Sequence, residues 1–152
     1  MSDGKEVKVY YSNKFKKDFK AIEKKHPDFS DALDDMIEVL RNREKLGEGM
    51  RGRFRMFKMP ESCRSFIIYE DKSLKMKSGS GVGSGHRTLH TVHKSSILLL
   101  TAFAKNQQSG LDIREQKSIC RSLQTVKDGT CSDTFKKLDK PLIRAILKDD
   151  AD

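Results

Sequence analysis

Apolar residues recur along the chain with two different spacings. Short β-branched and aromatic stretches predict strands, and apolar residues three or four positions apart predict helices. Residues 7–12 (VKVYYS) are β-branched and aromatic, and they predict a first strand. Apolar residues then recur at helical spacing over residues 15–22 and again over residues 33–40, with Pro27 between them. We therefore expect two N-terminal helices, a hairpin or a kinked pair, that pack on a sheet.

The second half of the chain predicts three more strands and a last helix. The strands are expected over about residues 53–59, 64–71 and 95–104. The last of them contains an unbroken apolar run, which is typical of a strand buried on both faces. Because the three strands are close in sequence, an antiparallel meander is the economical topology. Asp112 and Glu115 then have the spacing of a capping box at the start of a helix.

These elements predict an α+β domain over residues 1–127, a small antiparallel-rich sheet with two N-terminal helices packed on it and a C-terminal helix. Residues 75–94 combine a Gly/Ser tract with three histidines, so we expect a flexible insertion there. Residues 128–152 are expected to form a C-terminal extension, either a short helix near residues 142–147 or a partly disordered end.

Charge narrows the class of partner. The 152 residues carry 31 Lys and Arg against 22 Asp and Glu, a net charge of +9. This surplus favours a polyanion such as nucleic acid. An acidic protein partner is equally compatible, and a soluble basic protein without such a partner is the simplest alternative.

The cysteines and the apolar runs predict a cellular location. Cys63, Cys120 and Cys131 form no motif, so we expect free thiols in a reducing compartment. The N-terminal residues lack the apolar segment of a signal peptide, and no apolar run is long enough to span a bilayer. A cytoplasmic protein without membrane contact is therefore expected.

The predicted strands carry a set of cationic and amide side chains: Arg53, Arg55, Lys58, Arg64, Lys105 and Asn106. Side chains alternate along a strand, so Arg53 and Arg55 share one face while Lys58 takes the other. A basic sheet face can hold RNA phosphates and stabilise charge that develops when a 2′-hydroxyl attacks a phosphate. The alternative is that these are solvated edge-strand charges that prevent aggregation.

In order and spacing, these segments resemble the RelE/HigB superfamily, the toxins of bacterial type II toxin–antitoxin systems. The resemblance rests on GEGM at residues 47–50, the Arg/Lys strand, Arg64 ahead of an IIY strand, and LLTAFAKN at residues 99–106. It covers roughly residues 7–126. It implies a ribosome-dependent mRNA endoribonuclease that inhibits translation and needs no metal or other cofactor.

The resemblance and the basic strands together define the candidate site. The expected catalytic residues are Arg64, Lys105, Arg55 and Lys58. The expected RNA-binding residues are Arg51, Arg53, Asn106, Arg87 and His90. The implied partners are mRNA, the ribosome, and a cognate antitoxin that covers the basic surface with an acidic segment and can itself bind DNA. The alternative is a non-catalytic RelE/ParE-like protein, either a gyrase inhibitor or an inactive scaffold that binds nucleic acid or a partner.

Three histidines leave further alternatives open. His86, His90 and His93 would align on a helix, whereas on a strand His86 and His90 share one face and His93 takes the other. Imidazoles can act as a general acid or base, or bind zinc. Solvated or RNA-contacting loop histidines are the simplest interpretation, and we expect no metal.

Overall fold

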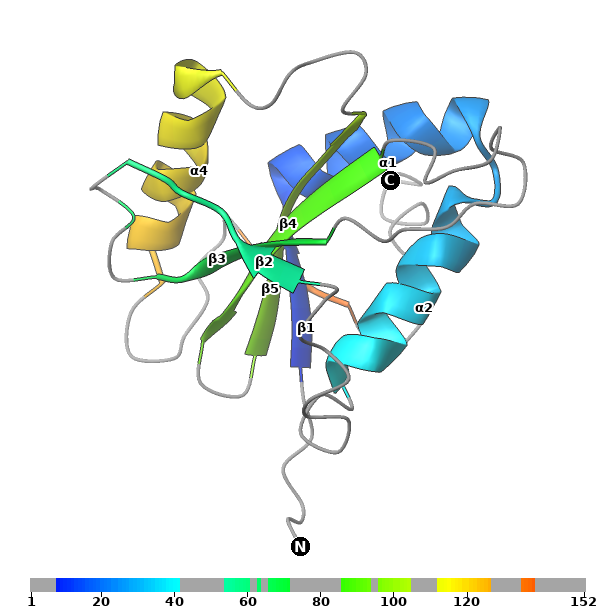
Figure 1. Ribbon diagram of the computed structural model, residues 1–152, viewed down its shortest axis with the longest axis horizontal. Coiled ribbons are helices and arrows are strands. Elements are labelled where there is room, and N and C mark those ends of the chain that lie inside the picture. Colours follow the sequence, from blue (N-terminus) through cyan, green and yellow to red (C-terminus); the bar gives the residue numbers. More distant parts are fainter. Residues whose placement is uncertain are drawn as a thin grey trace, which may run out of the picture.

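A computed structural model describes residues 8–41, 54–60, 63, 66–71, 86–93, 96–104, 112–126 and 135–138 of the chain. Its elements, in chain order, are β1 (Lys8–Ser12), α1 (Asn13–Lys25), α2 (Phe29–Arg41), β2 (Phe54–Met56), β3 (Ile68–Asp71), β4 (His86–His93), β5 (Ser96–Ala104), α4 (Ile113–Gln124) and β6 (Phe135–Lys137). The sheet lies between α1 and α2 on one side and α4 on the other (Figure 1).

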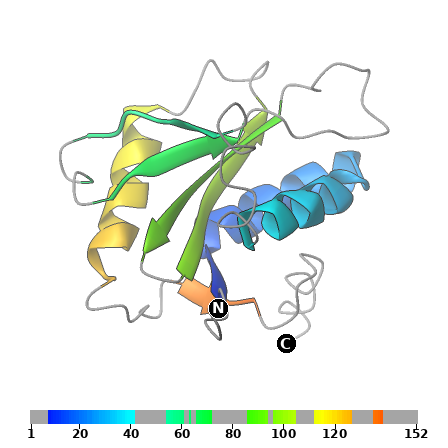
Figure 2. The same ribbon diagram turned by 60° about the horizontal axis from the view of Figure 1, so that its bottom comes forward.

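The strands form one mixed sheet in the order β2-β3-β4-β5-β1-β6. The four strands from β2 to β5 form an antiparallel meander. β1 joins the meander beside β5 and runs parallel to it, and the short β6 pairs with β1 in the antiparallel sense. The α+β class, with two N-terminal helices and a C-terminal helix on the sheet, is therefore confirmed. Figure 2 shows β6 beside β1 at the edge of the sheet.

β5 has the double burial that its apolar run predicts. Ile97 and Leu99 belong to the hydrophobic cluster under α1 and α2. Leu98 and Leu100 belong to a second cluster, which also contains buried residues of α4. A strand covered on both faces has no polar face to alternate with, and this explains its continuous apolar sequence.

β5 also contains a β-bulge, which the sequence does not reveal. Leu89 of β4 pairs with Thr101, but the next residue, His90, pairs with Leu99, so Leu100 is the extra residue. A bulge reverses the faces to which the following residues belong. Simple alternation from Leu99 would put residue 101 on the α1 and α2 side, but after the bulge it is Ala102 that belongs to the cluster under these helices.

The N-terminal helices form where the helical spacing predicts them. Ser12 caps α1, because its Oγ accepts a hydrogen bond from the Phe15 N–H at 3.1 Å. The same Oγ donates to the Leu100 carbonyl at 3.1 Å, which fixes the start of α1 against β5. The fully buried side chains of the two helices are Phe15, Phe19, Phe29, Leu33, Met36, Ile37 and Leu40.

The capping box predicted for the last helix is confirmed. The Glu115 N–H donates to Asp112 Oδ1 at 2.8 Å, and the Asp112 N–H donates to Glu115 Oε1 at 3.2 Å. α4 then buries Ile119, Cys120 and Leu123 against the sheet.

The expectation of a flexible insertion over residues 75–94 is wrong for residues 86–93. These residues form β4, which lies between β3 and β5. Thr88, Leu89 and Thr91 are fully buried there, and β-branched residues suit such a strand. The Gly/Ser tract itself lies outside the described residues. In the predicted C-terminal extension the structure has the strand β6, and the helix expected near residues 142–147 lies outside the described residues.

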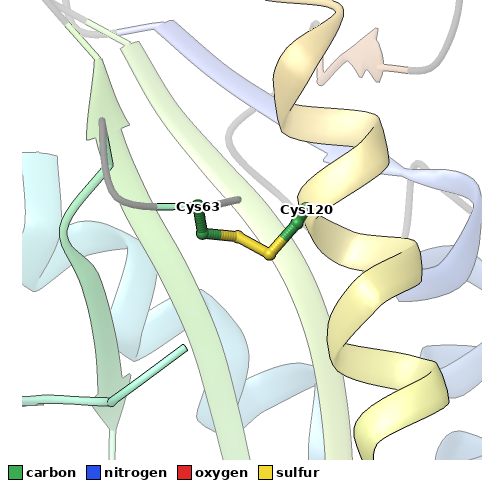
Figure 3. The surroundings of a disulfide bond; sticks show 2 residues. All are labelled: Cys63 and Cys120. Carbon is green, nitrogen blue, oxygen red and sulfur yellow. A yellow bond between two sulfur atoms is a disulfide. The ribbon is translucent and has the colours of Figure 1, made fainter. Parts of the chain in front are cut away.

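The expectation of free thiols is also wrong for two of the three cysteines. Cys63 and Cys120 form a disulfide across 57 residues of sequence. Figure 3 shows Cys63 on a short segment beside the strands and Cys120 on α4, with the bond between them. Cys131 lies outside the described residues. The disulfide links the connection between β2 and β3 to the helix that covers this face of the sheet.

Candidate nucleic-acid interface

The structure places four of the predicted site residues. Arg55 lies on β2, Lys58 follows that strand, and Arg87 and His90 lie on β4. The remaining predicted site residues lie outside the described residues: Arg51, Arg53, Arg64, Lys105 and Asn106. The part of the basic sheet that can be described is therefore the β2-β3-β4 side.

Strand register brings two arginine-bearing strands to the same carboxylate. β3 lies between β2 and β4, and its Glu70 pairs with Arg55 on one side and with Leu89 on the other. Arg87 lies two residues before Leu89 on β4, and its Nε is 3.5 Å from Glu70 Oε2. Glu70 is thus the ion-pair partner of Arg87 on one side and the register partner of Arg55 on the other.

Arg87 is held by protein groups. Its side chain is 15% exposed and that of Glu70 is 7% exposed, so the ion pair is largely removed from water. Arg87 Nη1 also donates a hydrogen bond to the His86 carbonyl at 3.1 Å. A phosphate would have to compete with both groups for this guanidinium. In this arrangement the Arg87 guanidinium connects β4 to β3 and is a poor site for RNA.

Replacing Arg87 is expected to destabilise the fold. Arg87→Met would leave the Glu70 carboxylate buried beside an apolar side chain, which costs on the order of 3 kcal/mol in the free energy of unfolding. The double variant Arg87→Met/Glu70→Leu removes both charges and should unfold within about 1 kcal/mol of the unmodified protein. Urea denaturation of the three proteins measures this. Equal losses in the single and double variants would show that the ion pair does not carry the effect.

Of the two predicted site cations whose side chains the structure describes, Lys58 and Arg87, Lys58 is the exposed one. The residue before it, Phe57, still pairs with β3, because the Phe57 N–H donates a hydrogen bond to the Ile68 carbonyl at 2.8 Å. Phe57 and Met59 on either side pack against the buried cluster that contains Cys63. Lys58 is therefore an accessible ammonium on a backbone that is fixed by its neighbours, a suitable ligand for phosphate.

The three histidines do not converge. His90 is fully buried, and its ring lies 5.6 Å from that of Tyr69, centroid to centroid, in a stacked arrangement. His86 contacts His26 and Phe29, with centroid distances of 5.1 and 5.6 Å.

His93 lies on the other face of β4, where its ring is 5.6 Å from that of Phe66. Because the His90 ring is sealed from solvent, it does not reach an RNA ligand in this conformation. Among the described residues, no group of three or more His, Cys, Asp or Glu side chains is arranged to hold a metal ion.

A polar network that sequence reasoning missed joins α1, the end of β5 and α4. Asp18 Oδ2 accepts hydrogen bonds from Thr101 Oγ1 at 2.5 Å and from the Ala102 N–H at 3.2 Å. Lys14 Nζ lies 3.3 Å from both Asp18 Oδ2 and Glu115 Oε2. The network fixes the end of β5, after which the sequence continues to the predicted site residue Lys105. Its partners are up to 101 residues apart, so no local motif reveals them.

Helix α1 provides a second cationic surface in the other layer of the fold. Its partly or fully exposed lysines include Lys16, Lys17, Lys20, Lys24 and Lys25. Desolvation by burial and the nearby Lys16 ammonium lower the pKa of Lys20. Among the described residues, α1 is thus a second place where lysines gather, apart from the β2-β3-β4 side of the sheet.

Comparisons of the chain with protein-family models, with curated proteins and with solved structures found no match. Within the described part of the chain, no helix combines the length and the apolar character that crossing a membrane requires.

Proposed function

We propose that this chain is the toxin of a toxin–antitoxin pair, a cytoplasmic, ribosome-dependent mRNA endoribonuclease of the RelE/HigB type. The observation that supports it best is the β2-β3 edge of the sheet, where Arg55 lies on β2 and the exposed Lys58 follows it. In sequence, Arg64 stands between these cations and β3. Such an edge can hold the phosphates on either side of a scissile bond.

The proposed reaction is a transesterification. The 2′-oxygen of the nucleotide before the cut loses its proton to a general base and forms a bond to the adjacent phosphorus. The bond between phosphorus and the 5′-oxygen breaks, and that oxygen gains a proton. The products are a 2′,3′-cyclic phosphate, which can open to a 3′-phosphate, and a 5′-hydroxyl end.

In this reaction the cations act by charge. The phosphorane-like transition state carries more negative charge on its oxygens than the ground state, so fixed cations stabilise it preferentially. Arg64, Arg55, Lys58 and Lys105 are proposed for this role, and Arg51, Arg53 and Asn106 for binding along the RNA backbone. A cognate antitoxin with an acidic segment would inhibit the enzyme by covering the same cations.

One observation favours the alternative, a non-catalytic RelE/ParE-like binding protein. Arg87 is held by Glu70, and His90 is buried, so these two residues offer RNA neither a free cation nor an accessible proton carrier. In that case the exposed Lys58 at the β2-β3 edge would belong to a protein interface, such as one with gyrase, or to a nucleic-acid scaffold.

The test is induced expression without an antitoxin, followed by primer-extension mapping of cellular mRNA. Cuts confined to translated reading frames, with growth arrest, support the proposed function. Purified protein should also cut mRNA on programmed ribosomes when a chelator selective for transition metals is present and Mg²⁺ is kept for the ribosome. Arrest with intact mRNA and gyrase-dependent DNA breaks would favour the alternative, and cuts in untranslated RNA would contradict dependence on the ribosome.

A further inference from the structure

The Cys63–Cys120 disulfide connects two parts of the fold that the backbone keeps apart. Cys63 lies between β2 and β3, and Cys120 lies in α4 (Figure 3). Both residues are 1% exposed and belong to the buried cluster against which Phe57, Met59 and Phe66 pack. Cys63 directly precedes Arg64 in the sequence. In sequence, the bond is therefore one residue away from a cation that the proposed function assigns to transition-state stabilisation.

Backbone hydrogen bonds connect Cys63 to residues before and after it in the chain. The Cys63 N–H donates to the Pro60 carbonyl at 2.9 Å, and the Cys63 carbonyl accepts from the Phe66 N–H at 2.8 Å. Pro60 follows the exposed Lys58 by two residues, and Phe66 precedes β3 by two residues. A bond that fixes Cys63 therefore also restrains Pro60 and Phe66, its two hydrogen-bond partners.

The helix α4, which carries Cys120 at the other end of the disulfide, is itself held in place. α4 buries Ile119 and Leu123 beside Cys120, and its capping-box residue Glu115 lies 3.3 Å from Lys14 of α1. A covalent bond to this helix restrains the β2-β3 connection more strongly than apolar packing alone, because apolar contacts permit local opening.

We propose that the Cys63–Cys120 disulfide is a redox-controlled tether that holds Pro60, Cys63 and Phe66 in place between β2 and β3, so that the oxidised protein cleaves RNA faster than the reduced one. This inference rests on the proposed function for its catalytic consequence. Its structural part, that the bond restrains the connection, can be measured without any RNA.

The chemistry is thiol–disulfide exchange with a small thiol reductant. A thiolate attacks one sulfur of the bridge, forms a mixed disulfide and releases the other cysteine, which takes up a proton. A second reductant thiol, as its thiolate, attacks the mixed disulfide and releases the remaining cysteine. Two protein thiols and one oxidised reductant disulfide result, and the two electrons come from the two reductant thiols.

The reverse exchange reforms the bridge from the oxidised reductant. A cytoplasmic thiol pool favours the dithiol form, whereas oxidising conditions favour the tether. The device would therefore raise RNA cleavage when the cell is exposed to oxidant.

The experiment compares fully oxidised and fully reduced protein after removal of excess reagent, in single-turnover cleavage on programmed ribosomes. The oxidised protein should cleave about 10- to 100-fold faster, since small displacements of positioned groups cost up to that factor. Cys63→Ser/Cys120→Ser should match the reduced protein under both conditions. Cys131→Ser, which keeps the bridge, should keep the full redox response.

Hydrogen exchange measures the tether directly. The Cys63 and Phe66 amides, which donate the two anchoring hydrogen bonds, should exchange faster in the reduced protein and in the double variant. Equal exchange in both redox states would overturn the tether. Equal or slower cleavage by the oxidised protein would overturn the switch while leaving the proposed function intact. Redox-dependent exchange without RNA cleavage in either state would support the tether and overturn the proposed function.

Discussion

Arg64→Ala is expected to slow mRNA cleavage on programmed ribosomes by about 10²–10³-fold. Loss of one pre-positioned group that stabilises transition-state charge has this size of effect in other active sites. Arg64 precedes β3 in the sequence, and under the proposed function its guanidinium stabilises the charge that develops on the scissile phosphate. Expression of the variant without an antitoxin should therefore no longer arrest growth.

Two further variants make the Arg64 measurement specific. Arg64→Lys keeps the charge but loses the planar fork, so it should retain part of the rate. Lys24→Ala removes an exposed cation from α1, in the other layer of the fold, and should leave the rate nearly unchanged. Far-UV circular dichroism and thermal unfolding check that each variant is folded. A folded Arg64→Ala protein with the full cleavage rate would remove Arg64 from the mechanism.

The elements that could be predicted are those whose signal is local. The helical spacing that includes Phe15 and Phe19 indicates the buried face of α1, and the capping-box pair Asp112 and Glu115 marks the start of α4. The apolar run of β5 indicates a strand covered on both faces, as found. In each case the residues that determine the element lie within one or two turns of each other, or on a single strand.

The elements that were missed depend on distant partners. β4 follows a Gly/Ser tract and carries polar residues, so it resembles a loop, yet pairing with β3 and β5 buries His90 and Thr88 completely. The β-bulge at Leu100 exists only in the pairing of two strands. The Arg87–Glu70 ion pair likewise follows from strand register, which a single sequence does not encode locally.

The same limit applies to the candidate site. Charge and strand alternation predict a basic sheet, and Lys58 is exposed after β2. Neither property separates a cation that faces solvent from one that is neutralised by a buried carboxylate, as Arg87 is. The cysteines show this limit most clearly, because spacing gave no reason to pair Cys63 with Cys120 across 57 residues.

That disulfide leads to the second large expected effect. Cys63→Ser/Cys120→Ser should lower the free energy of unfolding under oxidising conditions by about 4 kcal/mol, because a bridge across 57 residues restricts the unfolded chain strongly. Urea denaturation of the oxidised protein and the variant measures the difference. Reducing the unmodified protein should move its urea midpoint to nearly that of the variant, and Cys131→Ser should leave the midpoint almost unchanged.

Thiol titration of the unfolded protein, before and after reduction, shows whether the Cys63–Cys120 bond is present. An oxidised protein that unfolds at the same urea concentration as the double variant would mean that the bond contributes no net stability, and that non-covalent contacts such as the apolar packing of α4 and the Lys14–Glu115 ion pair hold the helix without it.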